Sequence, residues 1–366
     1  MELTDVFLHT LRMPLVSPFR TSYGIETSRQ AVLVQVVGPD VEGWGECVAE
    51  AEPLYTEEYS DSACHVITEF LVPRLSARPV EASGLSALFA PVKGNRMAKG
   101  GLEAAMLDAE CRRDGRSFGQ RLGAVHDRVP AGVSVGIHES IPALLDTVAG
   151  YLGDGYRRVK LKIEPGNDIA QVAAVRERFG PIALQVDANS AYTLADAAHL
   201  RALDNFDLLM IEQPLAQDDL TGHAELAKLI CTPICLDESI TSLASAHDAI
   251  VLGACSIVNI KAGRVGGYLE AVKIHDLCQR RSVPVWCGGM LETGIGRAAN
   301  VALAALPGFT LPGDTSASRR YFHRDVTDAF VLDDGHLRVP SGPGIGVSPI
   351  PEALAEFRTS LRRIAV

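Results

Sequence analysis

The chain has 366 residues, of which 47% are hydrophobic and 22% are charged, and its formal net charge is -11. This composition is typical of a globular protein with a large core and gives no reason to expect disorder. The acidic balance disfavours nucleic acids and anionic membranes as partners, because phosphate groups are not attracted to an acidic surface.

No apolar run reaches the roughly 18 residues that a membrane-spanning helix needs. The first residues also lack the basic and then apolar layout of a secretory signal. We therefore expect a cytoplasmic protein with no membrane partner. The eight cysteines show no C-x-x-C spacing, which favours reduced thiols over disulfides or a zinc site.

Residues 1–126 predict an α+β domain. Apolar residues alternate or run together at 6–15 and 31–39, as in antiparallel strands, and helical patterns follow at 57–75 and 101–113. The polar stretch 17–30 between the two strands predicts a long loop, of the kind that is often functional or mobile.

Residues 127–318 alternate between short apolar strands and amphipathic helical stretches. The helical period is clear at 169–180, 194–204 and 268–281. We expect strands at 131–135, 158–163, 183–186, 208–211, 234–236, 256–260, 283–286 and 309–311. Eight strands that alternate with helices predict an α/β fold with a closed parallel barrel.

Residues 319–366 form a third segment. They are rich in Pro and Gly, and we expect them to end in a short helix and to pack against the first domain. The glycine clusters near 264–268 and 287–297 lack the strand-GxGxxG-helix register of a dinucleotide site, so loop geometry is the better interpretation of them.

Five reactive side chains are almost equally spaced. Lys162, Asp187, Glu212, Asp237 and Lys261 are separated by 25, 25, 25 and 24 positions. This interval is about the length of one strand, one helix and two loops, so each residue falls at the same place in successive βα units. The strand ends of a barrel converge at one mouth, and the spacing therefore predicts an active site.

The strand at 158–163 carries two lysines on one face. Lys160 and Lys162 are two positions apart, so both side chains are expected to point into the barrel. A second positive charge nearby favours the neutral form of an amine, which a general base requires. We assign Lys162 as the base and Lys160 as the neighbour that tunes it, although two solvated lysines on an edge strand would also fit this pattern.

Three carboxylates, those of Asp187, Glu212 and Asp237, each follow an apolar strand directly. Taken singly, each could be a helix N-cap, but together they would repel one another unless a cation lay between them. Oxygen ligands without His or Cys favour Mg²⁺ or Mn²⁺. Asn189 could hold a ligand or substrate oxygen, and Glu238, which adjoins Asp237, is expected to support the metal ligands.

Lys261 is expected on the sixth strand, opposite Lys162 on the second. Two lysines on opposite faces of a bound carboxylate suit proton transfer at its α-carbon, assisted by a divalent ion. A Schiff-base aldolase and a barrel that binds a ligand without catalysis are alternatives, but neither explains why three acids would be clustered.

These residues resemble a known family. The K-x-K strand, the three acids and the last lysine are similar to the muconate lactonizing subgroup of the enolase superfamily. Almost the whole chain resembles the o-succinylbenzoate synthase / N-succinylamino acid racemase family, through MPLVSPFRTSYG, EGWGEC, GNRMAKGGLEAAMLDAE, KLKIEPG, NIKAGRVGGYLEA and CGGMLETGIGRAANVALAALPGFTLPGDTSAS. The resemblance implies a modified (β/α)7β barrel with a capping domain, and a homo-oligomer that is often an octamer.

The resemblance also implies roles for the five spaced residues. Lys162 and Lys261 become the acid/base pair, and the three acids bind Mg²⁺. The synthase reaction, a step of menaquinone biosynthesis, is a syn dehydration of 2-succinyl-6-hydroxy-2,4-cyclohexadiene-1-carboxylate through a metal-stabilised enediolate. Lys162 would take the α-proton and protonate the departing hydroxyl, while Lys261 stays a cation. Racemization of N-succinyl or other N-acyl amino acids requires both lysines to move protons.

Further positions match the family's substrate pocket, with simple loop packing as the alternative for each. They are Phe19, Ser134, Gly289, Met290, Leu291 and Tyr321. Arg264 matches an arginine associated with racemase competence. Related dipeptide epimerases carry Asp-x-Asp on the last strand to hold a substrate ammonium, whereas this chain has Gly313-Asp314-Thr315-Ser316, which argues against a free α-amino group.

We therefore expect an o-succinylbenzoate synthase that also racemizes N-acylamino acids. Racemization as the physiological role is the first alternative. Another α-proton-abstracting enzyme of the superfamily, acting on acid-sugar or muconate-type substrates, is the second.

Overall fold

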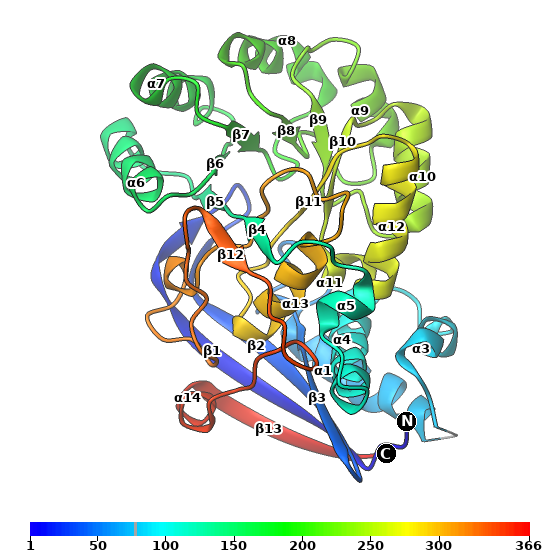
Figure 1. The fold of residues 1–366 in the computed structure, drawn as a ribbon. Helices are drawn as coiled ribbons and strands as arrows, with labels where there is room; N and C mark the ends of the chain where they lie inside the picture. Colours follow the sequence, from blue (N-terminus) through cyan, green and yellow to red (C-terminus); the bar gives the residue numbers. More distant parts are fainter. Residues whose placement is uncertain (77–78) are drawn as a thin grey trace.

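The computed structural model describes residues 1–76 and 79–366, and its two largest sheets are of different kinds. Figure 1 shows a four-stranded antiparallel sheet at one end and a parallel sheet surrounded by helices at the other. The antiparallel sheet has the order β13-β1-β2-β3. Its strands are β1 (Asp5–Arg20), β2 (Ile25–Gly38), β3 (Val41–Cys47) and β13 (Arg358–Ala365).

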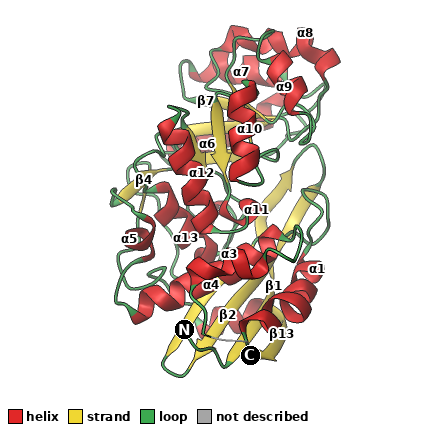
Figure 2. Ribbon diagram, turned by 90° about the vertical axis from the view of Figure 1, so that its right-hand side faces the viewer, coloured by secondary structure: helices red, strands yellow, loops and turns green. Residues whose placement is uncertain are grey.

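The helices of the first domain cover one face of this sheet, and α4 runs along it (Figure 2). These elements are α1 (Ser60–Val66), the π-helical turn η1 (Ile67–Leu71), α2 (Val72–Leu75), α3 (Ala82–Phe89), α4 (Arg96–Arg113) and α5 (Phe118–Leu122). Glycines bring β3 and α4 together, because a Cβ on Gly45 would lie only 2.3 Å from the carbonyl oxygen of Gly101. The GWGEC sequence is therefore a packing motif.

The parallel sheet has the strand order β11-β10-β9-β8-β7-β6-β5, so consecutive strands are neighbours. Its strands are β5 (Gly132–Val135), β6 (Arg158–Lys162), β7 (Leu184–Asp187), β8 (Ile211–Glu212), β9 (Ile234–Leu236), β10 (Ile257–Ile260) and β11 (Val285–Cys287). The longer helices between them are α6 (Ile141–Gly153), α7 (Ile169–Phe179), α9 (Leu220–Leu226), α10 (Leu243–Leu252), α12 (Tyr268–Arg280) and α13 (Gly294–Ala304). This is the predicted (β/α)7β architecture with a separate capping sheet.

Seven of the eight predicted strands are present, with ends shifted by at most a few residues, but the strand predicted at 309–311 is wrong. That segment makes only isolated parallel bridges, Val285 to Phe309 and Ala131 to Gly313. Pro312 has no N–H to donate, which interrupts a regular ladder at this point. The backbone still closes the ring, since Gly132 N donates to Gly313 O at 2.7 Å and Asp314 N donates to Cys287 O at 2.9 Å.

Two other predictions are corrected. The expected loop 17–30 is mostly strand, because β1 and β2 continue to a tight turn in which Thr21 N donates to Gly24 O at 2.9 Å. The tail does not end in a helix: α14 (Pro351–Phe357) is followed by β13, which pairs antiparallel with β1. The tail therefore packs against the first domain, as predicted, and the two termini lie at the same end of the molecule (Figure 1).

The remaining elements are short. The helix predicted at 194–204 is divided into η2 (Leu194–Asp196), α8 (Ala197–Leu200) and η3 (Arg201–Phe206). The others are β4 (Arg128–Pro130) paired with β12 (His336–Arg338), α11 (Ala262–Val265) and η4 (Ser318–Arg320). None of the helices among the described residues combines the length and apolar character required to cross a membrane.

Candidate active site

The equally spaced residues do meet at one mouth of the barrel. In the sheet register, Lys162 on β6 pairs with Asp187 on β7, and Asp187 pairs with Glu212 on β8. Asp237 follows the last residue of β9, and Lys261 follows the last residue of β10. Strands β6 and β10 are four positions apart in the sheet order, as the spacing predicted.

Lys160 lies at the centre of a buried ionic cluster. Its Nζ is 3.0 Å from Asp187 Oδ2, 3.1 Å from Glu212 Oε2 and 2.8 Å from Asp314 Oδ2. Burial opposes its charge, but these carboxylates, with Asp314 foremost, raise the pKa of Lys160 above its ordinary value. The cluster therefore favours the charged form of Lys160.

Lys162 is held between two side chains of the neighbouring strand. Its Nζ donates to Asp187 Oδ2 at 2.7 Å and to Asn189 Oδ1 at 2.6 Å. Asn189, in the left-handed conformation with φ of 42°, also donates through Nδ2 to Glu238 Oε1 at 2.8 Å. Asn189 thus links the candidate base to the glutamate that adjoins Asp237.

Lys261 lies in a second ionic group that includes a residue of the capping domain. Its Nζ is 2.8 Å from Asp237 Oδ2 and donates to the Tyr55 hydroxyl oxygen at 2.9 Å. Arg264 also pairs with Asp237, and its Nε donates to Ile240 O at 2.8 Å. Burial opposes the charge of Lys261, yet Tyr55 and then the carboxylates of Glu238 and Glu212 raise its pKa well above the ordinary value.

The pKa values of the buried acids in the site shift in different directions. The pKa of Asp187 is lowered, because Lys162 and Lys160 outweigh the effect of its burial. Burial and the charge of Asp187 raise the pKa of both Glu212 and Glu238. One more positive charge in this group would relieve that repulsion.

The donor chemistry of the three predicted ligands suits a divalent cation, although the side chains are not arranged around one point. Within residues 1–76 and 79–366, no three His, Cys, Asp or Glu side chains are grouped as a metal site. Asp187 and Glu212 converge on Lys160, whereas Asp237 is turned toward Lys261 and Arg264. The ligands are nonetheless all oxygens, and the neighbouring Glu238 Oε2 is buried without a hydrogen-bond partner among these residues. The residues present therefore fit such an ion in chemistry.

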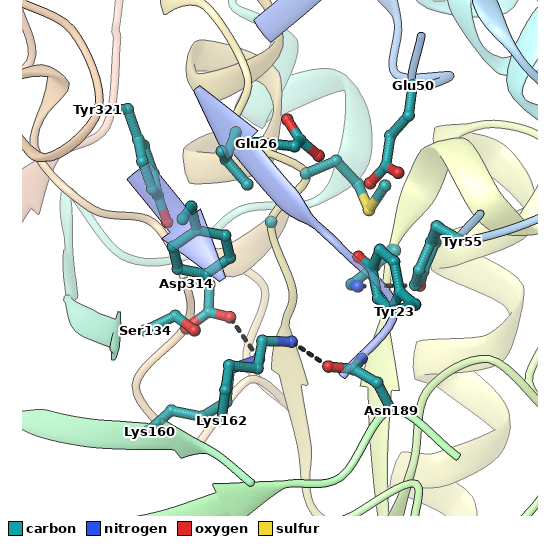
Figure 3. Close-up of a pocket in the computed structure, with 15 residues that line it drawn as sticks. Tyr23, Glu26, Glu50, Tyr55, Ser134, Lys160, Lys162, Asn189, Asp314 and Tyr321 are labelled. Carbon is teal, nitrogen blue, oxygen red and sulfur yellow. Dashed lines mark hydrogen bonds and ion pairs between the residues drawn. The ribbon is translucent and has the colours of Figure 1, made fainter. Parts of the chain in front are cut away.

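One pocket joins these groups. It encloses about 430 Å³ of empty space, and Lys160, Lys162 and Lys261 all line it (Figure 3). Every residue that the sequence suggested for substrate contact also lines it: Phe19, Ser134, Asn189, Gly289, Met290, Leu291 and Tyr321. The three predicted metal ligands, Glu238 and Arg264 lie behind this lining.

Comparisons with known families agree with this fold. Residues 3–123 match the mandelate racemase / muconate lactonizing enzyme N-terminal domain, and residues 143–353 match the enolase C-terminal domain-like family. The chain belongs to the enolase superfamily.

Similar members of the enolase superfamily carry two names. The chain is 60% identical to an N-succinylamino acid racemase of Amycolatopsis sp, over 98% of each chain. It is 50% identical to an o-succinylbenzoate synthase of Geobacillus kaustophilus, over 93% of this chain and 92% of the relative. A solved enolase-superfamily structure from Listeria innocua superposes with a TM-score of 0.96 at 41% identity, covering 100% of this chain and 99% of the other.

Five residues that line this pocket were not predicted from the sequence. They are Tyr23, Glu26, Glu50, Tyr55 and Asp314. Four of them come from the capping domain. Tyr23 and Glu26 lie in the polar stretch 17–30, which was expected to be functional, whereas no local pattern marks Glu50 and Tyr55. Asp314 adjoins Gly313 in the segment that closes the barrel, so its position at a strand end was a usable signal.

Proposed function

We propose that this chain is an o-succinylbenzoate synthase that also racemizes N-succinylamino acids at the same site. The observation that carries the proposal is the approach of two lysine amines, Lys162 Nζ and Lys261 Nζ, to one pocket from strands β6 and β10. Both reactions begin with removal of a proton from the carbon next to a carboxylate, so one arrangement of bases serves both. The names of the relatives support the same pair of activities.

In the synthase reaction, Lys162 Nζ accepts the α-proton and then returns it to the departing hydroxyl on the same face. The products are water and the aromatic acid, and no proton is left on the enzyme. Lys261 remains an ammonium on the other face, where it stabilises the negative charge that develops on the substrate. In racemization, one lysine removes the α-proton and the other donates a proton from the opposite face.

We further propose that Mg²⁺, or Mn²⁺ in its place, is the cofactor. Asp187, Glu212 and Asp237 would hold it, with Glu238 and Asn189 supporting them. When bound, the ion supplies positive charge that acidifies the α-proton of a carboxylate substrate. Lys160 contributes a further positive charge to this part of the site, two residues before Lys162 on β6.

Asp314 supports the choice of an acylated substrate. Its carboxylate contacts Arg158 Nη1 at 2.8 Å and Lys160 Nζ at 2.8 Å, and this pairing holds its pKa below the ordinary value although it is buried. A carboxylate already neutralised by two cations is not available to bind the ammonium of a free amino acid. An uncharged amide nitrogen, as in N-succinylamino acids, fits better.

Lysine variants test this function. Lys162→Ala should abolish dehydration of the cyclohexadiene substrate, because Lys162 is the base that we assign to that face. Lys261→Ala should abolish racemization and the incorporation of α-deuterium from one face, as measured by ¹H NMR in D₂O.

Chelation of divalent ions should stop both reactions of the unmodified protein, and added Mg²⁺ should restore them. Racemization that persists in Lys261→Ala, or turnover in the presence of chelator, would contradict the proposal.

The physiological role is a separate question, and racemization is the second candidate because a relative 60% identical to this chain bears that name. Neighbouring genes provide a test, since menaquinone genes favour the synthase and an acyltransferase with a hydrolase favours the racemase. We also propose a cytoplasmic homo-oligomer, of the octameric kind that the family resemblance suggests. Light scattering would test the oligomeric state.

A further inference from the structure

Two of the charged side chains that line the catalytic pocket have no ionic partner. The pocket contains six charged residues, and four of them are held in ion pairs: Lys160, Lys162, Lys261 and Asp314. The other two are Glu26 and Glu50. Within the part of the chain that the structure describes, neither carboxylate lies within 4.0 Å of a lysine, arginine or histidine nitrogen.

Glu26 and Glu50 come from two segments of the capping domain. Glu26 is on β2, directly opposite Phe19 of β1, and Glu50 follows β3 and forms a bridge with Tyr59. Both side chains are half-buried. Figure 3 shows their carboxylates on the side of the pocket away from Lys160 and Lys162.

The two carboxylates are close enough to repel each other. Burial, followed by the charge of Glu26, raises the pKa of Glu50 to about 7, even though Arg29, Lys261 and Lys162 act at longer range in the opposite direction. When two acids face one cavity and no cation contacts either of them, it is costly to keep both ionised. A bound cation would remove this cost.

The pair also lies where the catalytic pocket meets a second cavity. That cavity encloses about 740 Å³ of empty space, open to solvent, and shares Phe19, Tyr23, Glu26 and Glu50 with the catalytic pocket. The two carboxylates therefore lie at the boundary between the catalytic pocket and this solvent-open cavity.

We propose that Glu26 and Glu50 select N-acylamino acids whose side chain is cationic, of the arginine or lysine class. The inference rests on the proposed function, because the α-carbon must lie between Lys162 and Lys261. From there, a side chain directed toward the capping domain reaches both carboxylates. The succinyl carboxylate would be repelled in that direction, so the acyl arm lies against the barrel side of the pocket, near Ser134 of β5.

A pair of substrates of nearly equal shape tests this inference without any substitution. N-succinyl-L-arginine and N-succinyl-L-citrulline differ chiefly in the charge at the end of the side chain. Racemization of both is measured by loss of the α-proton signal in D₂O. We expect kcat/KM for the arginine derivative to exceed that for the citrulline derivative by about tenfold or more, because the loss of one desolvated charge pair has an effect of about that size. N-succinyl-L-glutamate should be the poorest of the three.

Variants identify the residues responsible. Glu26→Gln and Glu50→Gln should each lower the arginine-to-citrulline ratio, and the double variant should bring it close to one. Glu57→Gln is the matched control, because Glu57 is an exposed acid of the same segment that does not line the catalytic pocket. Its ratio should equal that of the unmodified protein.

The outcomes separate the two proposals. Racemization of all three compounds with a ratio near one, or a ratio unaffected in the double variant, overturns the selectivity and leaves the proposed function standing. Failure to turn over any N-succinylamino acid or the cyclohexadiene substrate overturns the proposed function itself.

Discussion

Lys160 contacts three buried carboxylates at once. Asp187 and Asp314 each have a second cation, Lys162 and Arg158, whereas among the described residues Glu212 pairs with Lys160 alone. Lys160→Met keeps most of the volume but leaves Asp187, Glu212 and Asp314 with one cation fewer. Removing one partner of a buried ionic group costs about 3–5 kcal/mol. We expect a loss of that order in the free energy of unfolding, measured by urea denaturation.

A surface ion pair provides the comparison for this prediction. Lys228 contacts Glu225 at 2.7 Å, but both side chains are more than half exposed. Lys228→Met should change the free energy of unfolding by less than about 1 kcal/mol. Equal losses in the two variants would mean that the cluster around Lys160 has no special role in stability.

At the scale of elements, the packing of β3 on α4 depends on glycine. A Cβ on Gly45 would lie 2.3 Å from Gly101 O and 2.6 Å from Ala105 N, both of which are backbone atoms that cannot move independently. Gly45→Ala should therefore force strand and helix apart and destabilise the protein by about 3 kcal/mol.

Gly150 is the control for this element. It lies in α6, is exposed, and has no atom within 4 Å of an added Cβ. Gly150→Ala should raise the free energy of unfolding by about 0.5–1 kcal/mol, because alanine favours the helix. Thermal unfolding measures both variants, and a stable Gly45→Ala protein would refute the packing argument.

The elements that the sequence predicted correctly are those with a clear hydrophobic period. The strands from β5 to β11 carry short apolar runs, and α7 and α12 repeat every three or four residues. The errors have physical causes. The closing segment at 309–311 is limited by Pro312, and β13 pairs with β1 while almost all of its side chains are exposed, so it has no alternating pattern to detect.

The residues of the candidate site also fall into a group that the sequence predicted and a group that it did not. The spacing of Lys162, Asp187, Glu212, Asp237 and Lys261 reflects the repeated βα unit, and the register of β6, β7 and β8 follows from it. The capping-domain residues of the pocket depend on how two domains meet. That arrangement is a tertiary property, which the spacing of residues along the chain does not contain.

At the scale of the whole molecule, buried acids of the capping domain hold the ends of barrel helices. Glu103 of α4 accepts a hydrogen bond from Leu269 N at 3.0 Å, at the start of α12. Glu46 of β3 accepts hydrogen bonds from Thr293 and from Gly296 N, at the start of α13. Burial raises the pKa of each to about 7, and the charge of Glu292 adds to the effect at Glu46.

These raised pKa values predict how stability varies with pH. A carboxyl whose pKa is raised on folding stabilises the folded state fully below its unfolded value of about 4.5, and this contribution is lost as the pH rises through about 7. From pH 5 to pH 8, the unmodified protein should lose about 2 kcal/mol relative to Glu103→Gln. Urea denaturation at the two pH values measures the difference. A difference that is independent of pH would show that Glu103 is not protonated in the folded protein.

The walls of the catalytic pocket are encoded in separate stretches of the chain. Lys160, Lys162 and Lys261 belong to barrel strands or their ends, whereas Phe19, Glu26, Glu50 and Tyr55 all lie within residues 19–55. A chimera that exchanges this one stretch between two relatives would replace the acidic wall and alter no barrel strand. The groups that meet the substrate side chain can thus be exchanged while the barrel lysines are kept, provided that Tyr55, which accepts a hydrogen bond from Lys261 Nζ, is retained.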